Sequence, residues 1–167
     1  MPFWRLYYHL IWPTKHREHI ITAAIEARLY PYLVSKAAEN GVYVYAINGS
    51  YDHVHMVVAI PPKYSVAEII KRLKGASSHY LSHELELVFD WQRGYGALSV
   101  GERQRAIAEA YVMKQKQHHA EQTTNIWLEQ TDQLEEEPID AGIQPNQTRS
   151  GVREPSASYD IWGEFPF

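Results

Sequence analysis

Two neighbouring runs of residues predict a β-hairpin, and this pairing limits the fold more than any other part of the sequence. The run from Val42 to Asn48 alternates and is rich in β-branched residues and tyrosine, and a second run extends from His53 to Ile60. Asn48-Gly49 is a pair typical of the tight turn that joins two antiparallel strands. Pro61-Pro62 ends the second run, because proline donates no hydrogen bond to a sheet. We therefore expect an antiparallel sheet.

Helices and further strands are expected around this hairpin. Thr22 and Ser65 are typical N-caps, and Glu68 follows Ser65 by three residues in a capping-box pattern. The other expected elements are a strand over 4–12, a helix from Thr22 to about Asn40, a helix opened by Ser65, strand material over 88–91 and 97–100, and a helix from Glu102 to about Gln117. This order indicates an α+β fold with helices on one face of an antiparallel sheet, as in ferredoxin-like or RRM-like domains.

Charge divides the chain into a domain and an appendage. Of the 167 residues, 1–130 hold 14 Lys and Arg against 12 Asp and Glu, a net charge of +2, whereas 131–167 hold 2 against 8, a net charge of −6. After Gln130 the sequence turns to Glu, Gln, Pro, Asn, Ser and Gly, a composition typical of flexible segments. We expect a mildly basic domain over 1–130 and an acidic flexible tail over 131–167.

The lack of cysteine excludes several classes of site. The chain has no disulfide scaffold, no thiolate zinc site and no cysteine nucleophile. Its first 12 residues lack the basic start and long apolar run of a signal peptide, and no stretch approaches the roughly 20 apolar residues of a membrane span. We expect a cytoplasmic protein that does not contact a membrane.

The second strand of the hairpin carries two histidines that suit a metal. Side chains two apart on a strand point to the same face, so His53 and His55 converge while Val54 turns into the core. Two imidazoles on a rigid strand supply two metal ligands. The alternative is a pair of half-exposed, hydrogen-bonded histidines beside a hairpin.

A tyrosine and a glutamine on the last predicted helix form a second candidate pair. Tyr111 and Gln115 are four residues apart and are therefore neighbours on one helix face. The amide oxygen of Gln115 could complete a metal site, and the phenol of Tyr111 could act as a nucleophile. In the alternative reading Tyr111 is a packing residue. His118 and His119 follow on about the same face, or they cap the end of the helix.

Five ordered motifs together resemble a known family. They are YHLIWPTKHR at 8–17, YDHVHMVV at 51–58, LKGASS at 73–78, WQRGYGALSV at 91–100 and YVMKQKQHH at 111–119. The set closely resembles the single-tyrosine HUH transposases of small bacterial insertion sequences, the IS200-like family that includes REP-associated tyrosine transposases. The resemblance covers roughly residues 4–120. Pro13 and His16 depart from the family pattern in the first turn.

The resemblance implies roles for the candidate residues. His53 and His55 would be the HUH histidines, Gln115 the third metal ligand and Tyr111 the nucleophile. It also implies a homodimer that acts on single-stranded DNA with imperfect hairpins at element ends, in which the Tyr111 helix comes from the same subunit or from its partner. The product would be a 5′-phosphotyrosine linkage and a free 3′-OH. An amide oxygen and a phosphate around the metal favour a hard ion, magnesium or manganese.

Basic and aromatic side chains are candidates for contact with DNA. Exposed cations bind phosphates, and aromatic rings stack on unpaired bases. Candidate phosphate contacts are Lys15, Arg17, Lys71, Arg72, Lys74 and Ser77, and candidate stacking residues are Tyr7, Tyr43 and Tyr45. The alternatives are a solvated helix face for the cations and core packing for the tyrosines.

Three other functions fit parts of the sequence. A domesticated HUH endonuclease that processes repeated palindromes would keep the same site. A non-catalytic module that binds single-stranded nucleic acid would use the aromatic strands alone. A metal-dependent hydrolase would use the two histidines with water as its nucleophile, so that Tyr111 would be dispensable.

Overall fold

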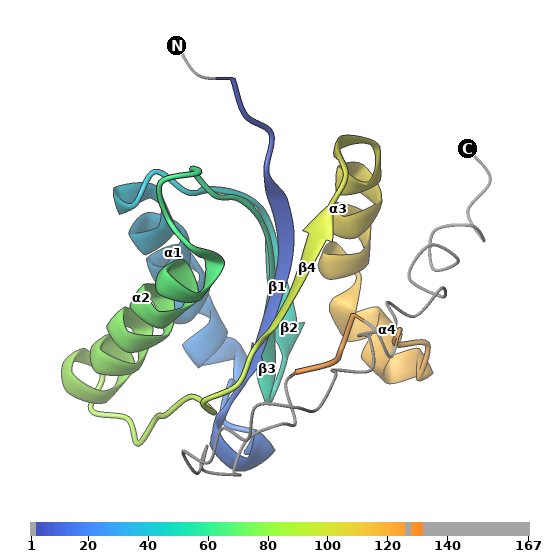
Figure 1. The fold of residues 1–167 in the computed structure, drawn as a ribbon. Coiled ribbons are helices and arrows are strands. Elements are labelled where there is room, and N and C mark those ends of the chain that lie inside the picture. The colour runs from blue at the N-terminus through green and yellow to red at the C-terminus, as the bar shows by residue number, and fades with distance from the viewer. Residues whose placement is uncertain (1–2, 126–127, 132–167) are drawn as a thin grey trace, which may run out of the picture. The chain divides into compact units, whose positions relative to one another are not determined.

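A four-stranded antiparallel sheet forms the centre of the protein, whose structure is a computed structural model that describes residues 3–125 and 128–131 (Figure 1). The strands are β1 (Tyr7–Pro13), β2 (Tyr43–Ser50), β3 (His53–Ala59) and β4 (Gly96–Val100), in the order β2-β3-β1-β4. The α+β class and the antiparallel sheet are confirmed. The described residues belong to one compact unit, Met1–Gln133. The tail predicted over 131–167 lies outside the described residues from position 132 onward.

The predicted hairpin is present, but its turn lies further along the chain than expected. Ser50 pairs with His53, so the turn is formed by Tyr51 and Asp52. Asn48 and Gly49, the expected turn, lie inside β2. The side chain of Asn48 donates a hydrogen bond to the backbone carbonyl of Met113 at 3.0 Å. A contact of this kind, made across 65 residues of sequence, fixes Asn48 inside the strand.

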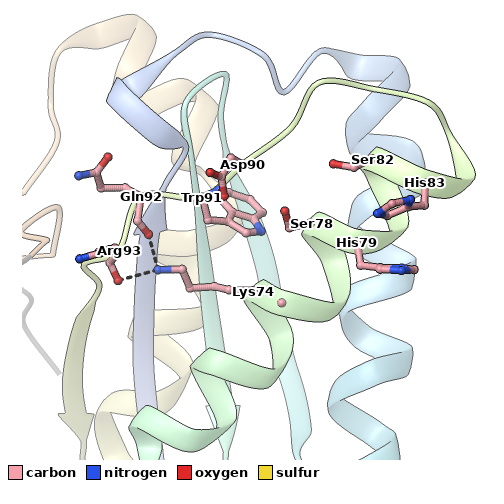
Figure 2. Close-up of a pocket in the computed structure, with 10 residues that line it drawn as sticks. Lys74, Ser78, His79, Ser82, His83, Asp90, Trp91, Gln92 and Arg93 are labelled. Carbon is pink, nitrogen blue, oxygen red and sulfur yellow. Dashed lines mark hydrogen bonds between the residues drawn. The ribbon is translucent and has the colours of Figure 1, made fainter.

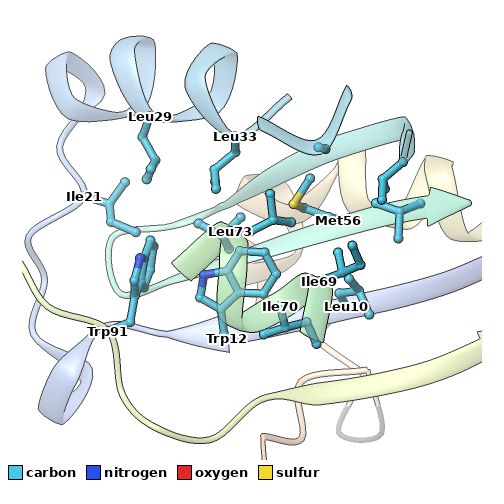
Figure 3. Packing of buried hydrophobic residues seen from close by; sticks show 14 of the residues in the cluster. Leu10, Trp12, Ile21, Leu29, Leu33, Met56, Ile69, Ile70, Leu73 and Trp91 are labelled. Atoms are coloured by element: carbon cyan, nitrogen blue, oxygen red, sulfur yellow. The ribbon is translucent and has the colours of Figure 1, made fainter. Parts of the chain in front are cut away.

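Two helices cover one face of the sheet. α1 (Ala23–Glu39) begins after Thr22, whose hydroxyl accepts a hydrogen bond from the Ile25 amide, and α2 (Val66–His79) begins after Ser65, which caps the Glu68 amide. A π-helical turn, η2 (Tyr80–Glu84), follows α2. The main core lies between these helices and the sheet (Figure 3) and includes Leu10, Trp12, Leu29, Leu33, Met56, Ile69, Ile70 and Leu73. Both predicted N-caps are confirmed.

Two more helices lie on the opposite face of the sheet (Figure 1), which corrects the expectation of helices on one face only. α3 (Arg105–Met113) and α4 (Gln115–Glu121) pack against β2, and α3 also packs against β3. Alternation along the strands explains this arrangement, because Leu10 and Trp12 face α1 and α2 while His9 and Ile11 face the other way. The site therefore lies on the second face, between the sheet and the last two helices.

The prediction of one continuous helix from Glu102 to about Gln117 is wrong. A short 3-10 turn, η3 (Glu102–Gln104), precedes α3, and Lys114 separates α3 from α4. In a continuous helix the carbonyl of Met113 would accept a hydrogen bond from Gln117, but here it accepts one from Asn48. This contact between β2 and the end of α3 accompanies the break in the helix just before Gln115.

The remaining differences concern β4 and its approach. The strand expected over 97–100 is confirmed as β4, whereas the strand material expected over 88–91 reduces to one isolated bridge between Thr14 and Trp91. A 3-10 turn, η1 (Lys15–Arg17), follows β1. Among the described residues no helix has the length and apolar character needed to cross a membrane.

Candidate active site

His53 and His55 lie at the start of β3 on the face covered by α3 and α4. Both side chains are fully buried, so they are not the half-exposed pair of the alternative interpretation. Their Nε2 atoms point to one place, where Glu129 lies. Oε2 of Glu129 is 3.2 Å from His55 Nε2 and 3.5 Å from His53 Nε2. The three donor atoms lie within 4.8 Å of one another, close enough to bind one ion together.

Tyr111 and Gln115 reach the same carboxylate from the other side. The Tyr111 hydroxyl donates to Oε1 of Glu129 at 2.8 Å and accepts a hydrogen bond from the Asn125 amide at 3.0 Å. Nε2 of Gln115 donates to the same Oε1 at 2.6 Å. Although the helix breaks between Tyr111 and Gln115, the structure brings both to the two histidines. The four residues predicted for the site are thus grouped around Glu129.

Two histidines of the last helix border this cluster. Nε2 of His119 is 3.1 Å from Nε2 of His53 and 2.9 Å from Nε2 of Gln115. His118 stacks on the Tyr111 ring, with 4.7 Å between the ring centroids. The two residues therefore contact different parts of the cluster: His119 contacts the Nε2 atoms of His53 and Gln115, and His118 contacts the ring of Tyr111.

Burial sets the charges of the site. It lowers the pKa of His55 to about 4, against the opposing effect of Glu129, so this imidazole is neutral at pH 7. Burial also raises the pKa of the Tyr111 phenol. For Glu129 burial again favours the neutral form, but hydrogen bonds from His55, Tyr111 and Gln115 together with the attraction of His55 outweigh it and lower the pKa. A carboxylate therefore lies between a neutral imidazole and an un-ionised phenol.

The donor set fits a divalent cation. Imidazole nitrogen and carboxylate oxygen are both common ligands of manganese, and a carboxylate is the usual protein ligand of magnesium. Oε1 of Gln115 is buried, and no residue in the described part of the chain bonds to it. A buried oxygen without a partner costs about 1–3 kcal/mol, a cost that a bound cation would offset. Glu129 and the free amide oxygen are therefore as well suited to an ion as the two histidines.

The cations predicted to contact phosphates lie in two places. Lys15 and Arg17 lie in η1, where Lys15 pairs with Asp90 at 3.1 Å and Arg17 pairs with Asp52 at 3.5 Å. Asp52 directly precedes His53, so Arg17 borders the candidate site. The other predicted contacts lie on α2, which covers the opposite face of the sheet.

The α2 residues differ in exposure. Lys71 and Arg72 are exposed, and Arg72 pairs with Glu68 at 2.6 Å. Lys74 reaches the backbone carbonyls of residues 92–94 beside a surface hollow of about 470 Å³ (Figure 2). Ser77 is fully buried, where it donates to the Leu73 carbonyl and accepts from the Trp91 indole. Such a hydroxyl presents no surface to DNA, so Ser77 has a structural role in this conformation.

The predicted stacking tyrosines gather at the other end of the sheet. Tyr7 and Tyr45 meet edge to face, with ring centroids 5.7 Å apart, and the Arg105 guanidinium lies over both rings. Tyr43 is 64% exposed. Of the three, Tyr43 offers the most free ring surface.

Sequence reasoning missed three residues that touch the predicted ones. Asp52 accepts a hydrogen bond from Nδ1 of His53, His9 bonds to Nδ1 of His55, and Glu129 contacts both histidines. Asp52 stands beside His53 in the sequence, which is a usable signal. His9 and Glu129 are 46 and 74 residues from His55, and their approach follows only from the fold.

Comparisons with known proteins agree with one another. Residues 2–115 match the model of a family described as transposase IS200 like. The ISDra2 transposase TnpA of Deinococcus radiodurans is 31% identical over 119 residues, which cover 67% of this chain and 85% of that protein. The transposase for insertion sequence element IS200 of Salmonella typhimurium is 30% identical over 114 residues, 64% of this chain and 74% of that protein.

Two solved structures have a similar fold. A crystal structure described as a transposase from Deinococcus radiodurans is 29% identical, with a TM-score of 0.53, and the match covers 68% of this chain and 93% of that chain. The structure of a REP-associated tyrosine transposase bound to a REP hairpin has a TM-score of 0.55 over 71% of this chain and 74% of that chain. Its identity is only 12%, so it supports the fold alone.

Proposed function

Because the chain belongs to the IS200-like transposase family, we propose that it cleaves and rejoins single-stranded DNA at hairpin-bearing element ends, with Tyr111 as the nucleophile. One observation carries the proposal. The Tyr111 hydroxyl and the Nε2 atoms of His53 and His55 approach a single carboxylate, that of Glu129, from different elements. A phenol next to a metal-binding cluster is what metal-assisted attack on a phosphodiester requires.

The groups around Glu129 suit magnesium or manganese. His53 and His55 would hold the ion through Nε2, Glu129 through Oε2 and Gln115 through its unpartnered Oε1. These four protein ligands would leave room at the ion for a phosphate oxygen and a water. When bound, the ion supplies positive charge that polarises the phosphorus and stabilises the charge that develops on its oxygens.

Tyr111 loses its proton as it attacks. A phenol has an ordinary pKa near 10 and burial raises the pKa of Tyr111 further, so the free phenolate is scarce at neutral pH. Glu129 Oε1 holds the hydroxyl at 2.8 Å and is the group that receives the proton. Bond formation to phosphorus makes that proton strongly acidic, so a weakly basic carboxylate suffices.

The covalent step conserves the energy of the phosphodiester. The Tyr111 oxygen bonds to phosphorus, the bond from phosphorus to the 3′ oxygen breaks, and that oxygen takes up a proton from water to leave as a 3′-OH. A 5′-phosphotyrosine remains. A later 3′-OH can attack this linkage and rejoin the DNA without ATP, which hydrolysis by water would not allow.

The path of the DNA is proposed from the exposed cations. Arg17 pairs with Asp52 and Lys15 lies in the same turn, η1, so these two cations are the candidates for contact with the scissile phosphate. Lys71, Arg72 and Lys74 lie on the opposite face and are candidates for the hairpin stem, and the exposed ring of Tyr43 is a candidate for stacking on a base. We further propose that the protein acts as a homodimer on DNA in the cytoplasm.

The test is covalent capture of DNA. The protein is incubated with single-stranded hairpin oligonucleotides and Mn²⁺, and the expected result is a protein–DNA adduct on a denaturing gel. Tyr111→Phe should abolish the adduct, whereas Tyr51→Phe, which changes an exposed tyrosine outside the site, should leave it unchanged. His53→Ala should abolish cleavage and leave hairpin binding largely intact.

Other outcomes would support other functions. Cleavage that survives in Tyr111→Phe without an adduct would indicate a hydrolase that uses water. Binding of hairpins without any cleavage would indicate a non-catalytic module. A domesticated endonuclease would form the same adduct, and only its action on repeated palindromes in place of element ends would distinguish it.

A further inference from the structure

We propose that Asp52 and His9 are positioning residues, each of which fixes one of the two metal-facing imidazoles. This inference rests on the proposed function, because it concerns the same metal site. An imidazole binds a metal through one nitrogen, and the hydrogen bond made by the other nitrogen decides which one is free. For His53 and His55 to bind through Nε2, both Nδ1 atoms must carry a hydrogen and donate it to an acceptor.

Asp52 is the acceptor for His53. Its Oδ1 lies 2.6 Å from Nδ1 of His53. The carboxylate is held in this orientation from its other side, because Oδ2 pairs with Arg17 at 3.5 Å. The Asp52 backbone is also fixed, since its carbonyl accepts a hydrogen bond from the amide of Thr14 at 2.8 Å and one from the Thr14 hydroxyl at 3.1 Å. The end of β1 thus holds the turn that carries this acceptor.

His9 is the acceptor for His55. Its Nε2 lies 2.8 Å from Nδ1 of His55, and the two ring planes differ by only 9°. His9 comes from β1, the strand next to β3, and is buried. A neutral imidazole that accepts through Nε2 carries its own hydrogen on Nδ1. That Nδ1 has no hydrogen-bond partner in the part of the chain that the structure describes, which leaves His55 as the only hydrogen-bond partner of the His9 side chain among these residues.

The two acceptors differ in charge, and this predicts an order of effects. An anionic acceptor forms a stronger hydrogen bond than a neutral one, so Asp52 should contribute more to metal affinity than His9. Loss of such a partner commonly lowers metal affinity about 10-fold to 100-fold. Substitutions that keep an acceptor atom should cost less than substitutions that remove it. If Asp52 or His9 had only a structural role, the loss of metal affinity would not depend on whether the substitution keeps an acceptor atom.

Binding of Mn²⁺ to the full chain without DNA tests the inference. Affinity is measured by the electron paramagnetic resonance signal of free Mn²⁺. Asp52→Ala and His9→Phe remove the acceptor and should weaken binding about 10-fold to 100-fold, whereas Asp52→Asn and His9→Gln keep an acceptor and should weaken binding less. Asp90→Ala is the matched control, because Asp90 also pairs with a cation of η1 but lies outside the site. It should bind Mn²⁺ like the wild type.

A second measurement reports the imidazole tautomer directly. Two-bond ¹H–¹⁵N correlation spectra should show the hydrogen on Nδ1 of His53 in the metal-free protein and on Nδ1 of His55 once Mg²⁺ is bound, and Asp52→Asn should move part of the metal-free His53 signal to the other tautomer. A wild type without these Nδ1 hydrogens would overturn the inference, as would folded acceptor-free variants that bind Mn²⁺ normally. Failure of the wild type itself to bind Mn²⁺, with His53→Ala as its reference, would overturn the proposed function as well.

Discussion

His9 and His55 are buried imidazoles, and this burial links the stability of the fold to pH. Burial lowers the pKa of His9 to about 3 and that of His55 to about 4, both from an ordinary value of 6.5. As pH falls through 6.5, His9 and His55 bind protons in the unfolded chain but remain unprotonated in the folded chain. The unfolded state therefore binds more protons between pH 6.5 and about 4, and stability is lost as pH falls through this window.

We expect the free energy of unfolding of the metal-free protein to decrease from pH 7 to pH 4. Each proton of difference contributes a slope of about 1.4 kcal/mol per pH unit. Urea denaturation in EDTA at several pH values measures the slope. His9→Gln removes one of the two groups and should reduce the slope by the contribution of about one proton, about 1.4 kcal/mol per pH unit. His83→Gln, which changes an exposed histidine, is the control. Equal slopes for the wild type and His9→Gln would contradict the assignment.

The sequence predicts the four candidate site residues better than the neighbouring residues that bond to them. His53 and His55 could be paired from their spacing, and Tyr111 and Gln115 from helical periodicity, because both patterns are local. Glu129 could not, since its contact with the histidines depends on how residues after α4 return to the sheet. The periodicity was also imperfect, because it placed Tyr111 and Gln115 on one unbroken helix.

At the scale of elements, β4 and the residues around Glu129 are closely packed. A Cβ atom at Gly96 would overlap the backbone oxygen of Gln130 and would come within 2.6 Å of the Ile11 side chain. Gln130 directly follows Glu129. The lack of a side chain at Gly96 therefore allows the segment that carries Glu129 to lie against the sheet.

Substitution of two glycines by alanine should separate the close packing at Gly96 from the general effect of replacing glycine on helix propensity. Gly96→Ala should destabilise the protein by about 1–3 kcal/mol, as overpacking commonly does, and should weaken Mn²⁺ binding by displacing Glu129. Gly75→Ala lies inside α2, where a Cβ meets nothing within 4 Å, and should stabilise the protein by up to about 1 kcal/mol. Urea denaturation measures both changes. The same sign for the two variants would refute the packing argument.

The helices and strands were predicted correctly where local capping and alternation set their bounds. They were predicted wrongly where tertiary contacts set the position of a turn or a helix break. Thr22 and Ser65 mark the two helix starts because their side chains cap the nearby amides Ile25 and Glu68. The hairpin turn and the break at Lys114 were missed for a single reason. Asn48 looked like a turn residue, but it lies in β2 and binds the carbonyl of Met113.

At the scale of the whole molecule, one chain contains every group of the proposed site. Tyr111 and His55 of the same chain have ring centroids 6.3 Å apart, and Glu129 bonds to both. A second subunit is not required to bring the nucleophile to the histidines. The sequence left open whether the site lies within one subunit or is shared by two, and we propose that it lies within one subunit.

Mixed dimers test this choice. Tyr111→Phe and His53→Ala subunits, which carry different tags, are produced together and offered hairpin DNA with Mn²⁺. In a site built from one chain, each subunit lacks a required group, so no adduct should form on either. In a shared site, Tyr111 of the His53→Ala subunit would meet His53 of its partner, and an adduct would appear on the His53→Ala chain alone.

Wild-type subunits mixed with either variant must form an adduct, which shows that the variant subunits do not inactivate the assembly. Since Glu129 holds Tyr111 next to its own histidines in this structure, we expect no adduct in the mixed variants.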